Sequence, residues 1–317
     1  MASRATWGWA VLALGLTLAL AACERKPADP LAEARAICNK DDGAARERVV
    51  ACTKLLDEGG LAGAVRAAAL AMRSQAHFAA DERTAALRDA EAALNLDPGE
   101  MRAAYVRASI LLDSGQLDAA ELLVDRMIAA RYRLDEAQLF AGRVALARSD
   151  YPAAVSAFNS ALEQHPDWPD ALALRGRAEE LQGHGPSART DYDNAIARDS
   201  TRTTQAYAWR CWMELRAKED SPQVRADAEA AVRAQPRSVE AHTCLGVVQL
   251  KAGEWGDAKN SFDAALQIRP GDPTALFGRG VARRRSGDGK GSEDINQASD
   301  FDWRVREFFL SLGVQTY

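Results

Sequence analysis

The chain has 317 residues, of which 47% are hydrophobic and 27% are charged, and its formal net charge at pH 7 is −5. This mildly acidic balance lacks the basic surface that nucleic-acid binding requires, so we expect no nucleic-acid partner. It also gives the chain little electrostatic attraction to anionic membranes.

Residues 1–22 have the pattern of a targeting segment. Arg4 supplies a positive start, and the apolar run from Trp9 to Leu20 is too short to span a bilayer, since about 20 apolar residues are needed. The segment ends in Leu20-Ala21-Ala22-Cys23, which resembles the lipobox of bacterial lipoproteins. The resemblance implies cleavage before Cys23 and lipid attachment to it. The alternative is ordinary secretion with an incidental cysteine.

The residue after the cysteine bears on which membrane receives the chain. An aspartate at this place in lipoproteins favours the inner membrane, and this chain has Glu24 instead. The resemblance therefore favours a lipid anchor in the outer membrane of a Gram-negative cell, with the chain facing the periplasm. Residues 23–30 form a short tether that reaches about 25 Å when fully extended, at ~3.3 Å per residue.

Residues 31–66 are predicted to form a helical extension, in which Cys38 and Cys52 flank a turn-like stretch from Asn39 to Gly43. Besides Cys23 the chain has four cysteines, and an even number in an oxidising compartment suggests two disulfides. A Cys38–Cys52 bond would close a loop of about 15 residues, worth ~3 kcal/mol in the chain-entropy model. We expect this bond to form.

From residue 67 to residue 306 the chain repeats itself every 34 residues. Successive repeats place Ala93, Ala161, Ala195 and Ala265 at one position, and a two-residue slip brings Ala231 to it as well. A period of 34 is typical of a solenoid of helix-turn-helix units, so we expect an all-α fold. The period defines seven units: 67–100, 101–134, 135–168, 169–202, 203–238, 239–272 and 273–306.

Small and aromatic residues recur at fixed positions of the unit. Small residues at positions 8 and 20 allow the two helices of a unit to approach closely, and an aromatic residue at position 24 fills the space between units. Glycine at position 15 ends the first helix, and proline at position 32 stops the second. Examples in chain order are Gly142, Ala154, Phe158 and Pro166, then Gly176, Gly183, Ala188 and Tyr192, then Gly246, Gly253, Ala258, Phe262 and Pro270.

These residues resemble the tetratricopeptide repeat (TPR) family, which implies a right-handed superhelix. Unit 101–134 departs from the pattern with Tyr132 where proline is expected, and unit 203–238 carries the insertion. The last unit places Asn296 and Ser299 at core positions, so we expect a degenerate unit there. Residues 307–317 are expected to form a capping helix over the exposed end.

The resemblance also implies that positions 2, 5, 9 and 12 of each first helix line a concave groove. Carried over position by position, the groove residues are Tyr105, Ser109, Leu139, Arg143, Arg177, Glu180, Tyr207 and Glu214. Arg143 and Arg177 share position 9 and either clamp a partner's carboxylate or form ordinary solvated ion pairs balanced by Glu180 and Glu214.

Two further features have two interpretations each. The aromatic cluster Tyr207, Trp209 and Trp212 is either a partner contact or internal packing. Cys211 and Cys244 lie on the first helices of adjacent units and form either a second disulfide or two small core residues.

No arrangement of residues indicates catalysis. The four histidines lack metal-ligand spacing, and no nucleophile motif is present, so we expect no catalytic site, metal or cofactor. The sequence favours a non-enzymatic scaffold or adaptor that binds a protein or peptide partner and assists an envelope complex of the pilus, secretion, outer-membrane or peptidoglycan machinery. The alternative is a module that captures free peptides or small envelope ligands.

Overall fold

The computed structural model describes residues 29–40, 43–199, 203–218 and 221–316. The targeting segment, Cys23 and most of the tether lie outside these ranges. Within them the regular structure is helical throughout, and no helix is long and apolar enough to cross a membrane. The helices are α1 (Ala32–Cys38), α2 (Ala45–Glu58), α3 (Gly63–Ala79), α4 (Arg83–Leu96), α5 (Met101–Asp113), α6 (Leu117–Ala129), α7 (Leu134–Ala147), α8 (Tyr151–Gln164), α9 (Pro169–Leu181), α10 (Gly185–Arg198), α11 (Thr204–Arg216), α12 (Pro222–Ala234), α13 (Val239–Lys251), α14 (Trp255–Ile268), α15 (Pro273–Arg285), α16 (Gly291–Phe301) and α17 (Val305–Ser311).

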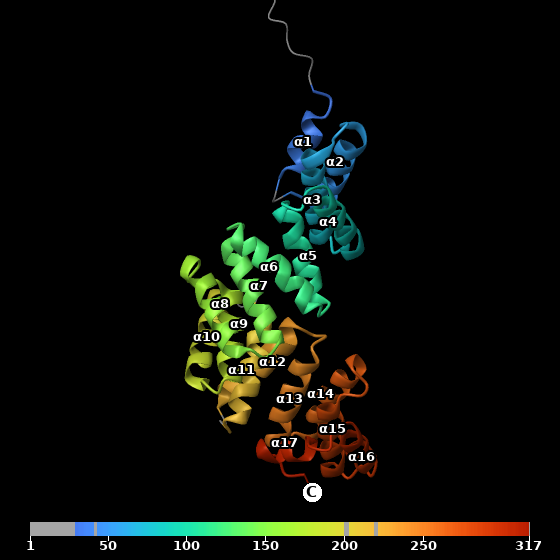
Figure 1. Cartoon of the computed structure of the whole chain (residues 1–317). Helices are drawn as coiled ribbons and strands as arrows, with labels where there is room; N and C mark the ends of the chain where they lie inside the picture. Colours follow the sequence, from blue (N-terminus) through green and yellow to red (C-terminus); the bar gives the residue numbers. More distant parts are fainter. Residues whose placement is uncertain (1–28, 41–42, 200–202, 219–220, 317) are drawn as a thin grey trace, which may run out of the picture.

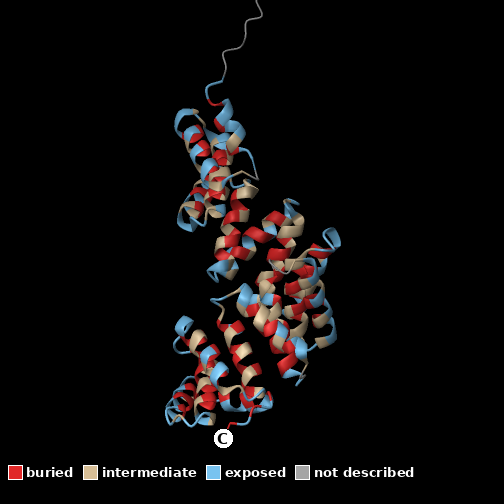
Figure 2. Cartoon of the chain, turned by 180° about the vertical axis from the view of Figure 1, so that it is seen from behind, coloured by how far each residue is buried: buried red, intermediate tan, exposed pale blue. Residues whose placement is uncertain are grey.

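The helices from α3 to α16 form consecutive pairs that stack in chain order along a curved, elongated body (Figure 1). Each helix packs mainly on its neighbours in sequence, and buried residues follow the inner sides of the pairs (Figure 2). This arrangement confirms the predicted all-α solenoid of helix-turn-helix units.

The spacing within a pair is set by a glycine that faces an aromatic ring. A Cβ atom added to Gly246 on α13 would lie 2.7 Å from the Phe262 ring on α14, and one added to Gly142 would overlap the Phe158 ring. The Phe262 ring also lies against Gly278 in the next unit, so one side chain fills the space within and between units. Both phenylalanines are completely buried. The predicted roles of positions 8 and 24 are therefore confirmed.

The turn inside each unit follows the predicted glycine pattern. Backbone φ is positive at position 15, where only glycine is unstrained. Three units hold an ordinary residue at this turn: Asp81 with φ 60°, Ser149 with φ 62° and, in unit 203–238, Lys218 with φ 59°. The glycines at this position are Gly115, Gly183, Gly253 and Gly287.

The register of α11 differs from the prediction by one residue. A fully or almost fully buried alanine occupies position 3 of every unit, and in α11 this residue is Ala206, which the 34-residue count places at position 4. The insertion is therefore divided, with one extra residue before α11 and the other after it. Tyr207 and Glu214 move off groove positions 5 and 12 for this reason. Glu214 is completely buried and accepts a hydrogen bond from Arg189 at 2.6 Å. Its predicted place in the lining of a concave groove was therefore wrong. The position-3 alanines of the other units are Ala69, Ala103, Ala137, Ala171, Ala241 and Ala275.

The last unit is also shifted by one residue, in its second helix. Ile295 and Ala298 on α16 are buried, whereas Asn296 is exposed and Ser299 is half-buried. Gly291 lies directly against Gly280 on α15. The unit therefore has a complete apolar core, and the prediction that Asn296 and Ser299 occupy it was wrong because the turn before α16 is one residue shorter.

Both cysteine pairs are disulfide-bonded. The Cys38–Cys52 bond joins α1 to α2, as predicted, and the helix after them, α3, begins at Gly63, four residues before the predicted start of the first unit. The Cys211–Cys244 bond joins α11 to α13, the first helices of adjacent units. The interpretation of Cys211 and Cys244 as two unbonded core residues was therefore wrong.

A repeated ion pair, which the sequence analysis missed, connects helices of neighbouring units. In four units an arginine of the first helix makes a two-pronged contact with a buried aspartate of the second helix. The same arginine reaches the second helix of the preceding unit, as Arg279 does to Asp263 at 3.0 Å. The pairs are Arg73–Asp89, Arg175–Asp191, Arg210–Asp227 and Arg279–Asp294.

Replacing Gly142 with alanine should lower the free energy of unfolding by about 1–3 kcal/mol, because the new Cβ overlaps the Phe158 ring in a packed interior. Thermal and urea unfolding followed by circular dichroism measure this. Gly185→Ala is the matched control, since nothing lies near its Cβ position. Equal midpoints for the two variants would contradict this account of helix spacing.

Replacing Arg210 with methionine leaves Asp227 buried without its main cation, and it should cost about 3–5 kcal/mol of unfolding free energy. Replacing both residues, with Asp227→Leu as the second change, should restore most of this loss, since no unpaired charge remains. Arg148→Met serves as control, because its partner Asp118 is 98% exposed and such pairs contribute less than ~1 kcal/mol. A double variant as unstable as Arg210→Met alone would refute the explanation.

Candidate functional site

First helices of three adjacent units enclose a cavity of about 400 Å³ that we call the open groove. Its lining includes Leu139 and Arg143 of α7, Ala173 and Leu174 of α9, and Trp209 of α11. Leu139 and Arg143 were both predicted as groove residues. Asp170, Thr203, Thr204, Gln205, Ala206 and Gln235 complete the lining.

Arg143 is held in place by its own chain. Its guanidinium donates to Asp113 of α5 at 2.9 Å and lies 5.7 Å from the centre of the Phe140 ring. Burial raises the pKa of Asp113, but hydrogen bonds from Arg83 and Arg143 lower it more, so the net shift is downward. The charged head of Arg143 is thus fixed at the groove wall, about one third exposed.

Tyr105 packs beside this wall. Its ring stacks on Phe140 with centroids 5.2 Å apart, and the Arg133 guanidinium lies 4.8 Å from its centre. Burial raises the pKa of the Tyr105 hydroxyl. Tyr105 is therefore a half-buried packing residue next to the open groove and is not part of its lining.

Arg177 belongs to a cluster that we call the Glu180 centre, made of Arg177 and Glu180 on α9, Tyr192 on α10 and Arg216 on α11. Glu180 accepts hydrogen bonds from Arg177 at 2.9 Å, from Arg216 at 2.6 Å and from the Tyr192 hydroxyl at 2.8 Å. The Arg177 guanidinium also lies 5.8 Å from the Trp209 ring centre, which connects the Glu180 centre to the open groove.

Of the two interpretations of Arg143 and Arg177, the contacts within the chain agree with the ion pairs, although Glu214 pairs with Arg189 and Arg143 pairs with Asp113. Each of the two arginines binds a carboxylate of its own chain, Asp113 or Glu180. The arginine that shares a carboxylate with Arg177 is Arg216, which the sequence analysis missed because it stands at the end of α11, outside the expected groove positions.

The three aromatic residues of α11 differ in their surroundings: one lines the cavity, and two pack inside the protein. Trp209 lines the open groove. Trp212 is buried, and its indole nitrogen donates to the carbonyl of Glu240 at 3.1 Å. Tyr207 packs against a small buried cluster of Ala208, Ala231 and Ala241.

The C-terminal segment closes one end of the concave face. The predicted capping helix is α17, which lies against both helices of the last unit (Figure 1). Its Phe309 ring lies 4.9 Å from that of Phe277 on α15, centre to centre, in a tilted arrangement. Phe308 reaches back to Trp212 of α11, with ring centroids 5.7 Å apart. Phe309 and Leu312 are completely buried in the same cluster as Trp212. The C-terminal segment thus covers the concave face from Trp212 of α11 to α15. The open groove is lined by Trp209, one helical turn before Trp212 on α11.

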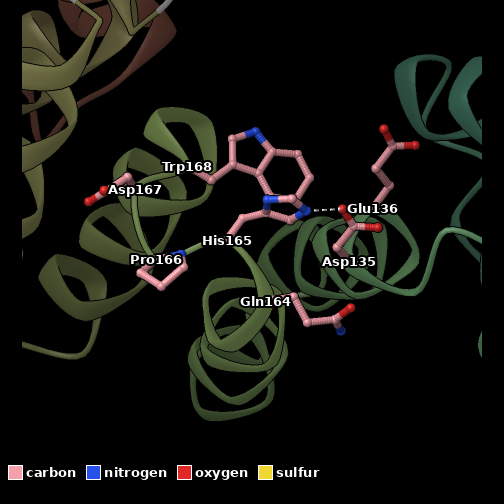
Figure 3. Close-up of a pocket in the computed structure, with 7 residues that line it drawn as sticks. All are labelled: Asp135, Glu136, Gln164, His165, Pro166, Asp167 and Trp168. Carbon is pink, nitrogen blue, oxygen red and sulfur yellow. Dashed lines mark ion pairs between the residues drawn. The ribbon is translucent and has the colours of Figure 1, made fainter.

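A second, more open cavity of about 500 Å³ lies at the turn between α8 and α9 (Figure 3). His165 contacts Asp135 at 2.8 Å, and the Trp168 ring lies edge-on 5.9 Å from His165. Burial raises the pKa of the nearby Glu136, while Arg133 opposes the shift. Among the described residues, no group of three or more histidine, cysteine, aspartate or glutamate side chains could hold a metal ion.

Comparisons with known proteins agree with this architecture. The structure resembles a tetratricopeptide repeat protein from Parabacteroides merdae with 15% identity and a TM-score of 0.56, covering 84% of this chain and 96% of that chain. It also resembles a chain in the APC/C hetero-tetramer Cut9–Hcn1 with 15% identity and a TM-score of 0.57, covering 88% of this chain and 55% of that chain. At such identities these likenesses show the fold alone. A search of curated proteins found no match.

The family model described as "Tetratricopeptide repeat" matches residues 71–135, 141–203, 213–273 and 245–302, which together are more than half of the chain. These segments coincide with the helix pairs from α3–α4 to α15–α16. The chain is therefore a member of the tetratricopeptide repeat family, whose repeats form protein–protein interaction scaffolds.

Proposed function

We propose that this protein is a lipid-anchored scaffold of the bacterial envelope that binds a segment of a partner protein in the open groove. The observation that carries the proposal is the groove itself, with apolar side chains from α7, α9 and α11 beside arginines fixed by internal carboxylates. Apolar pockets with a few oriented polar groups are typical binding sites. The partner belongs to an envelope complex, and the outer membrane is the proposed site of anchoring.

Support for an extracytoplasmic location comes from two independent features. The sequence of residues 1–23 has the pattern of a lipoprotein signal, and both disulfides belong to the type of cross-link that persists in oxidising compartments. A lipid anchor also suits a chain whose described helices include no membrane span.

Replacing Cys23 with serine should release the chain from the membrane, because the lipid has no attachment site. Fractionation of host cells with immunoblotting measures this. Glu24→Asp is the matched variant, which should stay membrane-bound and move from the outer to the inner membrane. A Cys23→Ser chain that stays in the membrane pellet would rule out the anchor.

Placing a photo-crosslinking amino acid at Leu174 in intact host cells should capture one envelope protein, since this side chain lines the open groove. The control site is Leu122 on α6, which is 64% exposed and outside the groove. Mass spectrometry identifies the captured species. The same products from both sites would contradict groove binding, and a small peptide or ligand captured at Leu174 alone would favour the capture module instead.

A further inference from the structure

The Glu180 centre has an excess of positive charge on the concave side of the solenoid. Two guanidinium groups, Arg177 and Arg216, share the single carboxylate of Glu180. The Glu180 side chain is only 8% exposed, whereas Arg177 is 25% and Arg216 is 47% exposed. The carboxylate is therefore more buried than the two cations that bind it.

Two of the ion pairs that connect the units have a different balance. Arg210 faces the carboxylates of Asp227 and Asp193. Arg279 faces those of Asp294 and Asp263, and Asp294 also binds Arg283. At the Glu180 centre the ratio is reversed, so an additional anion would complete the charge balance.

Both arginines are also oriented by aromatic rings. Arg177 lies 5.8 Å from the ring centre of Trp209, and Arg216 lies 5.8 Å from that of Trp212. Fixing the guanidinium groups before binding reduces the entropy lost when a ligand arrives. Burial lowers the pKa of Arg216, Glu180 opposes this shift, and Arg177 adds to it.

An apolar site adjoins these cations. Trp209 lies against Arg177 and also lines the open groove, together with Leu139 and Leu174. The one carboxylate of the groove lining, Asp170, lies seven residues before Arg177 on α9, which is about 10 Å along the helix axis at 1.5 Å per residue. The end of the groove near Arg177 therefore favours an anion next to an apolar side chain.

We propose that the open groove recognises an acidic polypeptide segment, in which a carboxylate binds Arg177 and Arg216 while an adjacent apolar side chain enters between Leu139, Leu174 and Trp209. This inference rests on the proposed function and names the chemistry of the partner. A carboxylate can accept from both guanidinium groups at once, a geometry that arginine favours. Because Phe308 of the C-terminal segment lies against Trp212, the bound polypeptide segment is limited to the three units that line the groove.

Selection of random twelve-residue peptides displayed on phage against the purified full-length chain tests this directly. The selected peptides should be enriched in aspartate or glutamate next to a large apolar residue. Fluorescence anisotropy with the most enriched peptide should show at least tenfold weaker binding to Arg177→Gln and to Arg216→Gln. Each variant leaves Glu180 one arginine partner, so the fold is retained, and thermal unfolding checks this.

Arg148→Gln is the control, because Arg148 is a partly exposed arginine that pairs with Asp118 and Glu121 and lies outside the open groove. It should change the affinity less than twofold. Selected peptides without acidic enrichment, acidic peptides that bind both groove variants normally, or the absence of any selected peptide would overturn the inference. Crosslinking from Leu174 that still captures a protein would then leave the proposed function intact, whereas loss of that capture too would remove both.

Discussion

The contact between a glycine on the first helix and an aromatic ring on the second sets the helix spacing in three units of the solenoid, at Gly142, Gly176 and Gly246. It brings the paired helices closer than side chains would otherwise allow, and the same ring then fills the space against the next unit, as Phe262 does between Gly246 and Gly278. Because no unit can bury this ring alone, the stability of each depends on its neighbours. Unit 203–238 is one of four units without the ring. There Cys211 takes the glycine position and Ala228 the ring position, and Cys211 is bonded to Cys244.

The sequence was sufficient to predict the fold because small residues recur at a fixed period. It did not reveal how the two-residue slip in unit 203–238 was divided, since Ala231 fixes the register of α12 alone. The error moved Tyr207 and Glu214 onto the groove. The Glu180 centre was not predictable because its side chains come from three helices whose rotation about their axes is set by packing. The apolar residues of α17 predicted that this helix is buried. They did not predict which surface of the solenoid it packs against.

The concave face consists of two chemically different halves. In the open half, position 9 holds Arg143 and Arg177, which remain partly exposed. In the half covered by the C-terminal segment, position 9 holds Trp212, Val247 and Val281, which are all buried. The chain thus uses apolar residues where its own C-terminal segment packs and charged residues where the face is left open.

The Cys211–Cys244 bond lies at the boundary between these halves. Solenoids behave as springs, since each unit contacts only its neighbours and small rotations between units add up along the body. The covalent bond between α11 and α13 removes this freedom between their two units. The C-terminal segment, which packs on α11 and α15, restrains the units that follow. Elastic bending is therefore confined to the units before α11. These units bend relative to a more rigid C-terminal part of the solenoid.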